Sequence, residues 1–301
     1  MSLSTSSRRL FIASILAASA GAMLPAFAAE FSSERISMTA EGQGKDVILI
    51  PGLGSSPRVW RELVKAVPGY RYHMVQVHGF AGHARGKNAE GAVAAPVAEE
   101  IARYIAANKL DKPAVIGHSM GGSIGIMLAG RHPGAVSKLM VVDMMPYLGA
   151  LFAGPAATPD SVKPMADALK AQMLNPDQAA REARTTATIN GMVDTVAMRA
   201  GALEDSLKSD PDVVARGFHE LVVTDLKSEL EKITVPATVL YVTPKRPGIT
   251  DEQIDAAYKA SYAPLKGVTL KRIAGSAHFI MWDQSAQFQA EVKGFLGQPT
   301  P

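Results

Sequence analysis

Short apolar runs alternate with segments of helical periodicity along most of this chain. The runs are rich in β-branched residues and bounded by glycine, proline or polar residues, which is typical of strands buried on both faces. Strands are predicted at residues 47–50, 72–77, 114–116, 138–142, 235–242 and 269–273, with a short edge strand at 34–40. Helices are predicted at 58–67, 92–108, 123–130, 251–262 and 284–296. This alternation predicts an α/β fold, with a mostly parallel, doubly wound sheet and helices on both faces.

The pattern changes between residues 146 and 224, where no strand-like run occurs. Methionine, leucine and valine recur there at helical spacing, as in Met165, Leu169 and Met173. We interpret this segment as a helical cap of three or four helices, inserted between two strands. The predicted core therefore comprises residues 29–145 and 225–301, and the predicted cap residues 146–224.

The first 28 residues are predicted to be an export signal and not part of the core. A twin arginine, Arg8 and Arg9, precedes an apolar stretch at residues 10–24, and Ala26-Phe27-Ala28 is typical of a cleavage site. The stretch is short and rich in small residues, whereas a membrane-spanning helix needs about 20 apolar residues. Export by the twin-arginine route to the periplasm or outside the cell is the prediction, with general secretion and an uncleaved anchor as alternatives. No stable membrane insertion is expected after cleavage.

Charge and cysteine content exclude several classes of function. The chain has 301 residues and a net charge of +3, and removal of residues 1–28 takes away two arginines and leaves +1. No basic run remains that would favour nucleic acid binding. The absence of cysteine excludes disulfides, thiolate metal sites and a cysteine nucleophile.

The segment Gly117-His118-Ser119-Met120-Gly121 follows an apolar strand and precedes a helix of small residues. A serine on so sharp a turn has its hydroxyl pushed clear of both elements, and glycine is needed two residues before and after, where a Cβ would clash. Ser119 is therefore the predicted nucleophile, although the motif by itself also fits a mere tight turn. A serine needs a base to take its proton.

Of the seven histidines, His278 is the best candidate for that base, because it lies in a loop just past the last predicted strand. His118 is expected to line the substrate pocket, and His78 and His83 lie in a glycine-rich loop from which they could touch substrate, with His78 as the predicted substrate-binding residue. His73, His132 and His219 are expected to be structural. No pair has a convincing metal-ligand spacing, so neither a metal nor a cofactor is predicted.

Four motifs make the chain resemble the α/β-hydrolase superfamily over residues 34–297. They are Ile50-Pro51-Gly52-Leu53-Gly54, the elbow around Ser119, Val141-Val142-Asp143, and Gly275-Ser276-Ala277-His278-Phe279. Their order, nucleophile then acid then histidine, is the order of that superfamily. The fold alone does not fix the substrate.

The resemblance leaves the triad acid open. Most of the family has the acid after the strand that is here 238–242, but the next residues, 243–247, contain no carboxylate. Asp143 is favoured because some members place the acid after the preceding strand. Asp251 is the alternative, although it also suits the start of a helix. Asp283 is a third candidate and is expected to cap the last helix.

The resemblance also implies an oxyanion hole formed by the backbone N–H groups of Leu53 and Met120. Met144 and Tyr147, at the base of the cap, are expected to line an apolar pocket, or alternatively to pack cap against core.

The predicted function is that of a serine hydrolase that cleaves a small-molecule carboxylic ester through an acyl-enzyme. The same triad would also suit a lactonase, an aminopeptidase or a cofactor-free perhydrolase. A receptor-like, ligand-binding member with little turnover is the alternative from another class. Dehalogenases and epoxide hydrolases are disfavoured, because those relatives carry aspartate at the elbow.

Overall fold

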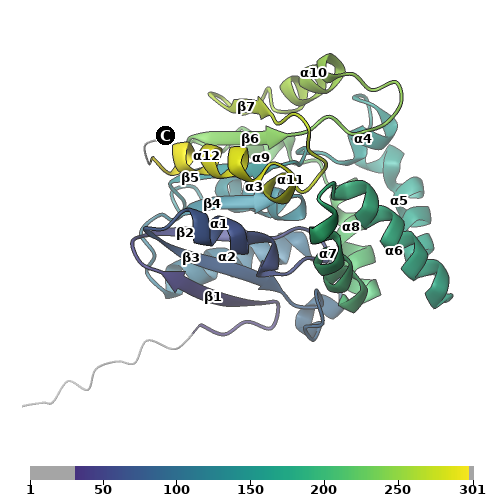
Figure 1. Cartoon of the computed structure of the whole chain (residues 1–301), viewed down its shortest axis with the longest axis horizontal. Helices are drawn as coiled ribbons and strands as arrows, with labels where there is room; N and C mark the ends of the chain where they lie inside the picture. The colour runs from purple at the N-terminus through teal and green to yellow at the C-terminus, as the bar shows by residue number, and fades with distance from the viewer. Residues whose placement is uncertain (1–30, 298–301) are drawn as a thin grey trace, which may run out of the picture. The chain divides into compact units, whose positions relative to one another are not determined.

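The computed structural model of this chain describes residues 31–297, so the predicted export signal at residues 1–28 lies outside the described residues. One sheet of seven strands, in the order β1-β3-β2-β4-β5-β6-β7, forms the centre of the described part (Figure 1). The strands are β1 (Ile36–Gly42), β2 (Lys45–Ile50), β3 (Tyr70–Val77), β4 (Ala114–His118), β5 (Lys138–Val142), β6 (Ala237–Tyr241) and β7 (Thr269–Arg272).

All neighbouring strands pair in parallel except β1, which is antiparallel to β3 at the edge of the sheet. The α/β class and the mostly parallel sheet are therefore confirmed. In a parallel sheet all carboxyl ends meet at one edge, where ligands usually bind. The register places Gly117 opposite Val141 and His118 opposite Val142, so the residues that follow β4 and β5 lie side by side.

Helices cover both faces of the sheet. Alternate residues of each strand face opposite sides. Ile48 and Ile50 therefore pack in one apolar cluster, whereas Val47 and Leu49 pack in the other. The first cluster includes residues of α2 (Ala94–Ala107), α3 (Met120–Arg131), α9 (Lys227–Leu230) and α10 (Asp251–Ser261). The second includes residues of η1 (Pro57–Trp60), α1 (Arg61–Ala66), α11 (Ile280–Asp283) and α12 (Ser285–Leu296).

Five helices follow β5 and precede α9 and β6, where the sequence predicted three or four. They are α4 (Gly149–Ala153), α5 (Pro159–Met173), α6 (Gln178–Met192), α7 (Val196–Lys208) and α8 (Pro211–Val223). Figure 1 shows these helices beyond the carboxyl ends of the strands. We keep the name cap for residues 146–224. The extra helix is α4, a short element in an apolar stretch with no polar face to reveal its period.

A buried carboxylate of the cap attaches α8 to the core. Glu220 is 8% exposed and accepts hydrogen bonds from the backbone N–H groups of residues 93–95, at 2.6, 2.8 and 2.9 Å. These N–H groups begin α2 and have no intrahelical acceptor, so a carboxylate there satisfies them and stabilises the helix dipole. In residues 31–297, no helix is long and apolar enough to cross a membrane.

Candidate active site

Ser119 lies between the end of β4 and the start of α3 in a strained backbone conformation, with φ 53° and ψ −122°. Its N–H donates to the carbonyl of Val142 at 2.9 Å, which fixes the turn against β5. A Cβ on Gly117 would lie 2.1 Å from the carbonyl oxygen of Gly121, and one on Gly121 would lie 2.1 Å from that of Ile50. Both glycines are therefore required by close backbone contacts, as the motif predicted.

His278 and Asp143 are hydrogen bonded, with 2.6 Å between Nδ1 and Oδ2. Asp143 directly follows β5 and is 10% exposed at its side chain, against 21% for His278. A carboxylate on Nδ1 fixes the histidine tautomer and leaves Nε2 free to act as a base. The structure thus brings together the two side chains that the sequence placed first as acid and base.

The other carboxylate oxygen of Asp143 also has partners. Oδ1 accepts from the N–H of Val242 and from the hydroxyl of Tyr258, each at 3.2 Å. Burial, with the nearby Asp143 charge as a second cause, raises the pKa of Tyr258 well above its ordinary value. Tyr258 is therefore a permanent donor that holds Asp143 in place. This role could not be predicted from the sequence, because a tyrosine on the apolar face of a helix usually packs in the core.

Ser119 and His278 lie in one neighbourhood at this edge of the sheet. The rings of His278 and His118 are 4.6 Å apart, and His118 directly precedes the serine. A Cβ on Gly52 would lie 3.1 Å from Nδ1 of His118 and 3.2 Å from Cβ of Ser119, so the turn after β2 meets both. Within residues 31–297 no hydrogen bond joins the Ser119 hydroxyl to His278. In enzymes without bound substrate, catalytic hydrogen bonds are often long or poorly aligned, and they shorten when substrate binds.

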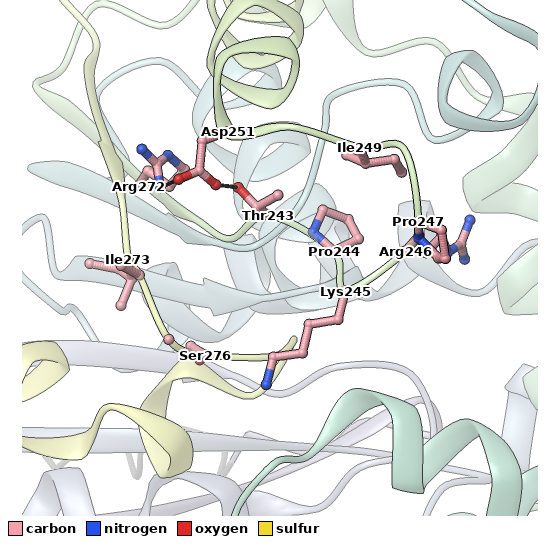
Figure 2. A pocket seen from close by; sticks show the side chains of 12 residues that line it. Thr243, Pro244, Lys245, Arg246, Pro247, Ile249, Asp251, Arg272, Ile273 and Ser276 are labelled. Carbon is pink, nitrogen blue, oxygen red and sulfur yellow. Dashed lines mark hydrogen bonds and ion pairs between the residues drawn. The ribbon is translucent and has the colours of Figure 1, made fainter.

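The alternative acids are engaged elsewhere. Asp251 accepts from the Thr243 hydroxyl at 2.6 Å and forms an ion pair with Arg272 at 2.6 Å (Figure 2). As expected, Asp251 is also the first residue of its helix, α10, and the preceding Thr250 is the N-cap, whose side chain accepts from the N–H of Gln253. Asp251 therefore faces a partner other than His278.

Asp283 accepts from the N–H groups of Asp194, Thr195 and Ala277, at 3.1, 2.8 and 3.1 Å. It holds a cap loop against the histidine loop and does not cap α12, for which it was expected. Its side chain points toward these loops because their N–H groups have it as their acceptor.

An open cavity of about 520 Å³ lies beside the loop that follows β6. Figure 2 shows Asp251 turned toward Thr243 and Arg272 on one side of it, and Lys245 and Ser276 below. This is the loop in which the resemblance would most often place the acid. Here it contains no carboxylate before Asp251, and the acid that reaches the histidine comes from the end of β5.

The backbone N–H groups of Leu53 and Met120 make no hydrogen bond to any acceptor within residues 31–297. Met120 is the first residue of α3, where N–H groups lack intrahelical acceptors. Leu53 lies in a turn that is closed by a hydrogen bond from Ser55 N–H to the Gly52 carbonyl at 3.2 Å. Both groups are thus free to donate to a developing negative charge.

His118 does not line an open pocket, which differs from the sequence expectation. It is 1% exposed, and its Nε2 donates to the backbone carbonyl of His278 at 3.1 Å. Burial, and to a lesser extent His278, hold its pKa well below the usual value, so the ring is neutral. Its Nδ1 has no partner among the described residues. His118 therefore supports the histidine loop from beneath.

The other residues expected at the substrate lie in packed surroundings. Met144 is 5% exposed and belongs to the main core cluster, and Tyr147 is 2% exposed and packs with Val162 and Val222 inside the cap. This arrangement matches the alternative of cap packing that the sequence left open. The His78 ring stacks with His83 at 6.4 Å between centroids. Within the described part of the chain, no hydrogen bond or ring contact joins His78 to Ser119 or His278.

A residue of the cap that the sequence did not single out packs against the side chains of the two predicted oxyanion residues, Leu53 and Met120. A Cβ on Gly217, in the middle of α8, would lie 2.9 Å from the Leu53 side chain and 3.6 Å from the sulfur of Met120. Glycine inside a helix costs stability, so its presence is the signal that could have indicated a close contact. In residues 31–297, no three His, Asp or Glu side chains are placed to hold a metal ion.

The model of a protein family described as the alpha/beta hydrolase fold matches residues 46–285. A pimeloyl-[acyl-carrier protein] methyl ester esterase of Vibrio cholerae is 26% identical over 260 residues, which cover 85% of this chain and 93% of that protein. The structure is similar to an esterase from Exiguobacterium antarcticum, with a TM-score of 0.73, 20% identity, and coverage of 87% and 95% of the two chains. It is also similar to an enol-lactonase from Burkholderia xenovorans, with a TM-score of 0.68, 17% identity, and coverage of 87% and 96%. At such identities the structural likeness concerns the fold alone.

Proposed function

Since this chain belongs to the family of the alpha/beta hydrolase fold, we propose that it is a serine esterase that cleaves a carboxylic ester through an acyl-enzyme. The observation that carries the proposal is the strained Ser119 at the end of β4, beside a histidine whose Nδ1 is bonded to Asp143 at 2.6 Å. A strained serine next to an oriented base is the arrangement that nucleophilic catalysis requires.

In the proposed mechanism, Nε2 of His278 takes the hydroxyl proton as Oγ of Ser119 attacks the ester carbonyl carbon. The carbonyl oxygen becomes negative and accepts hydrogen bonds from the N–H groups of Leu53 and Met120. The C–O bond to the alcohol then breaks, and His278 returns its proton to the departing oxygen. Water, deprotonated by His278, then attacks the acyl carbon, the bond from that carbon to Oγ breaks, and His278 returns the proton to Oγ, which releases the acid and restores Ser119. Asp143 stabilises the charged histidine in both halves.

For the substrate we propose a small-molecule carboxylic ester. A curated relative across 85% of this chain is named as a methyl ester esterase acting on an acyl-carrier-protein substrate, so a methyl ester of a carrier-bound acyl chain is a second candidate. A lactone is the alternative within the same chemistry, because ring opening uses the same attack on an ester carbonyl.

The test is fluorophosphonate labelling with intact mass, together with hydrolysis of p-nitrophenyl butyrate, on wild type and Ser119→Ala. We expect one label per chain and hydrolysis in wild type, and loss of both in Ser119→Ala. Ser123→Ala is the matched control, since Ser123 is buried one turn further along α3, and it should label normally. A folded wild type that takes no label and hydrolyses nothing would favour the receptor-like alternative. Methyl esters and lactones of matched length then separate the substrate classes.

We also propose that residues 1–28 direct export to the periplasm or beyond. The proposal rests on the twin arginine, the apolar stretch and the cleavage motif. Mass spectrometry of the exported protein should find Ala29 as the first residue. Replacing Arg8 and Arg9 by lysine should block export by the twin-arginine route, whereas export that persists would point to general secretion.

A further inference from the structure

The end of cap helix α7 is hydrogen bonded to the turn that contains Leu53. Asp205 is 7% exposed, and its Oδ2 accepts from the N–H of Ser56 at 3.1 Å and from the Ser56 hydroxyl at 2.5 Å. Its other oxygen lies 3.4 Å from a guanidinium nitrogen of Arg58. One carboxylate of the cap therefore holds the end of the segment that carries the first predicted oxyanion donor.

The same end of α7 is fixed from a second side. Ser209 donates to the carbonyl of Asp205 at 2.8 Å and lies 3.3 Å from that of Gly54, while it accepts from the N–H of Ala81 at 2.8 Å. The N–H of Gly82 donates to the Lys208 carbonyl at 3.1 Å. Since residues 81 and 82 belong to the loop after β3, Asp205 is held by the core and is not carried on a freely moving lid.

The direction of the Leu53 N–H depends on this arrangement. Leu53 lies inside the turn from Gly52 to Ser55, and Ser56 is the next residue along the chain. Gly54 has φ +66°, which glycine adopts without strain, so the position of the turn relative to the cap is set by the hydrogen bonds from Ser56 to Asp205 and from Ser209 to the Gly54 carbonyl. A shift of the turn by 1 Å would take the N–H out of hydrogen-bond range of an oxyanion.

We propose that Asp205 is a positioning residue that sets the Leu53 N–H for the oxyanion, so that a cap helix completes the active site. This role rests on the serine-hydrolase function proposed above. A purely structural role explains the residue less well, because a buried charge is a costly way to join two elements and apolar packing there would serve stability equally.

The experiment compares Asp205→Ala with Glu204→Ala in the otherwise unchanged protein. Glu204 is the neighbouring residue on α7 and bonds Arg58 at 2.8 Å and Lys208 at 2.6 Å, but it does not touch the turn. For each variant we would measure kcat and KM on p-nitrophenyl butyrate, the inhibition constant of a trifluoromethyl ketone, and the urea unfolding midpoint. The ketone adds to Ser119 and places a negative oxygen where the transition state has one, so its affinity reports the oxyanion donors.

In Asp205→Ala we expect kcat to fall by about 10- to 100-fold, less than the loss of a complete oxyanion donor. KM should stay within about threefold, because the ground-state carbonyl gains less from the donor than the transition state does. The inhibition constant of the ketone should rise by the same factor by which kcat/KM falls. Glu204→Ala should match wild type in all three values. If Asp205→Ala does not fold, Ser56→Ala removes one of the two donors and should lower kcat in the same direction.

Folded Asp205→Ala with a wild-type kcat, a loss confined to KM, or an unchanged ketone affinity would each overturn the role of Asp205. A wild type that neither hydrolyses the ester nor binds the ketone would remove the proposed function, and this role with it. The two failures are therefore distinguished by the wild type alone.

Discussion

Replacing Asp143 by asparagine should lower kcat/KM by about 10³- to 10⁴-fold, up to the loss of about 10⁴-fold in kcat that follows when the carboxylate of a serine-protease triad becomes an amide. The structure gives the reason. Asparagine keeps one oxygen, which can still accept from Val242 N–H and Tyr258 as Oδ1 does now at 3.2 Å. Its amide NH₂ then takes the place of Oδ2, 2.6 Å from Nδ1 of His278.

Two donors cannot face each other at that distance, so the histidine proton moves from Nδ1 to Nε2. A proton on Nε2 removes the lone pair that must accept the serine proton, and the imidazolium loses its countercharge as well. A 10³- to 10⁴-fold loss corresponds to about 4–5.5 kcal/mol of transition-state stabilisation. The fold should survive, because the two Oδ1 hydrogen bonds remain and only one charge-assisted bond, worth about 1.5–3 kcal/mol, is lost.

The assay is kcat/KM on p-nitrophenyl butyrate, with urea unfolding of the same samples. Asp251→Asn is the matched control, since Asp251 bonds Thr243 and Arg272 and should leave kcat/KM within about threefold of wild type. An Asp143→Asn enzyme that keeps activity within tenfold of wild type, or an Asp251→Asn enzyme that loses it, would refute the assignment of the acid.

Two further predictions concern stability and a third concerns the elbow at Ser119. His118 is neutral when folded because its pKa is held well below 6.5. Below pH 6.5 the His118 ring therefore takes up a proton in the unfolded chain but not in the folded one, and the free energy of unfolding should fall by up to about 1.4 kcal/mol for each pH unit. Urea unfolding at a series of pH values should show this decrease in wild type, and His118→Phe should remove the contribution of this residue. Glu220→Ala should lower that free energy by about 2–4 kcal/mol, since it leaves buried N–H groups at the start of α2 without an acceptor, and a variant as stable as wild type in urea would contradict this. Gly121→Ala should prevent fluorophosphonate labelling, because the new Cβ would lie 2.1 Å from the Ile50 carbonyl oxygen. The control is Gly191→Ala, at a position in α6 with open space around it; this variant should label normally, and its free energy of unfolding should rise by up to about 1 kcal/mol.

The sequence by itself determined the features that depend on residues close together in the chain. Strand runs such as 47–50 and 138–142 were predicted because a strand buried on both faces needs continuous apolar residues. The elbow at Ser119 was predicted because its backbone strain and the close contact between Gly117 and Gly121 arise within two residues of the serine, whereas the contact of Gly121 with the Ile50 carbonyl is tertiary. The alternation of apolar runs with segments of helical periodicity was sufficient for the α/β class.

Some boundaries moved for local reasons. The helix expected at 58–67 begins as the 3-10 turn η1, because Pro57 stands at its start. The helix expected from residue 123 starts three residues earlier, at Met120, because Ser119 itself is the N-cap of α3.

Only the tertiary structure decided which side chains meet. Asp143 and Asp251 both follow strand ends in the sequence. Only the paths of the loops after β5 and β6 bring Asp143 into a hydrogen bond with His278 and Asp251 into an ion pair with Arg272. His118, next to the nucleophile in sequence, is turned beneath the histidine loop by the pleat of β4. Asp205 reaches Ser56 across 149 residues. Such contacts join residues that are far apart in the sequence, and their geometry is set by the packing of the whole domain. They produce no periodic pattern in the sequence from which they could be predicted.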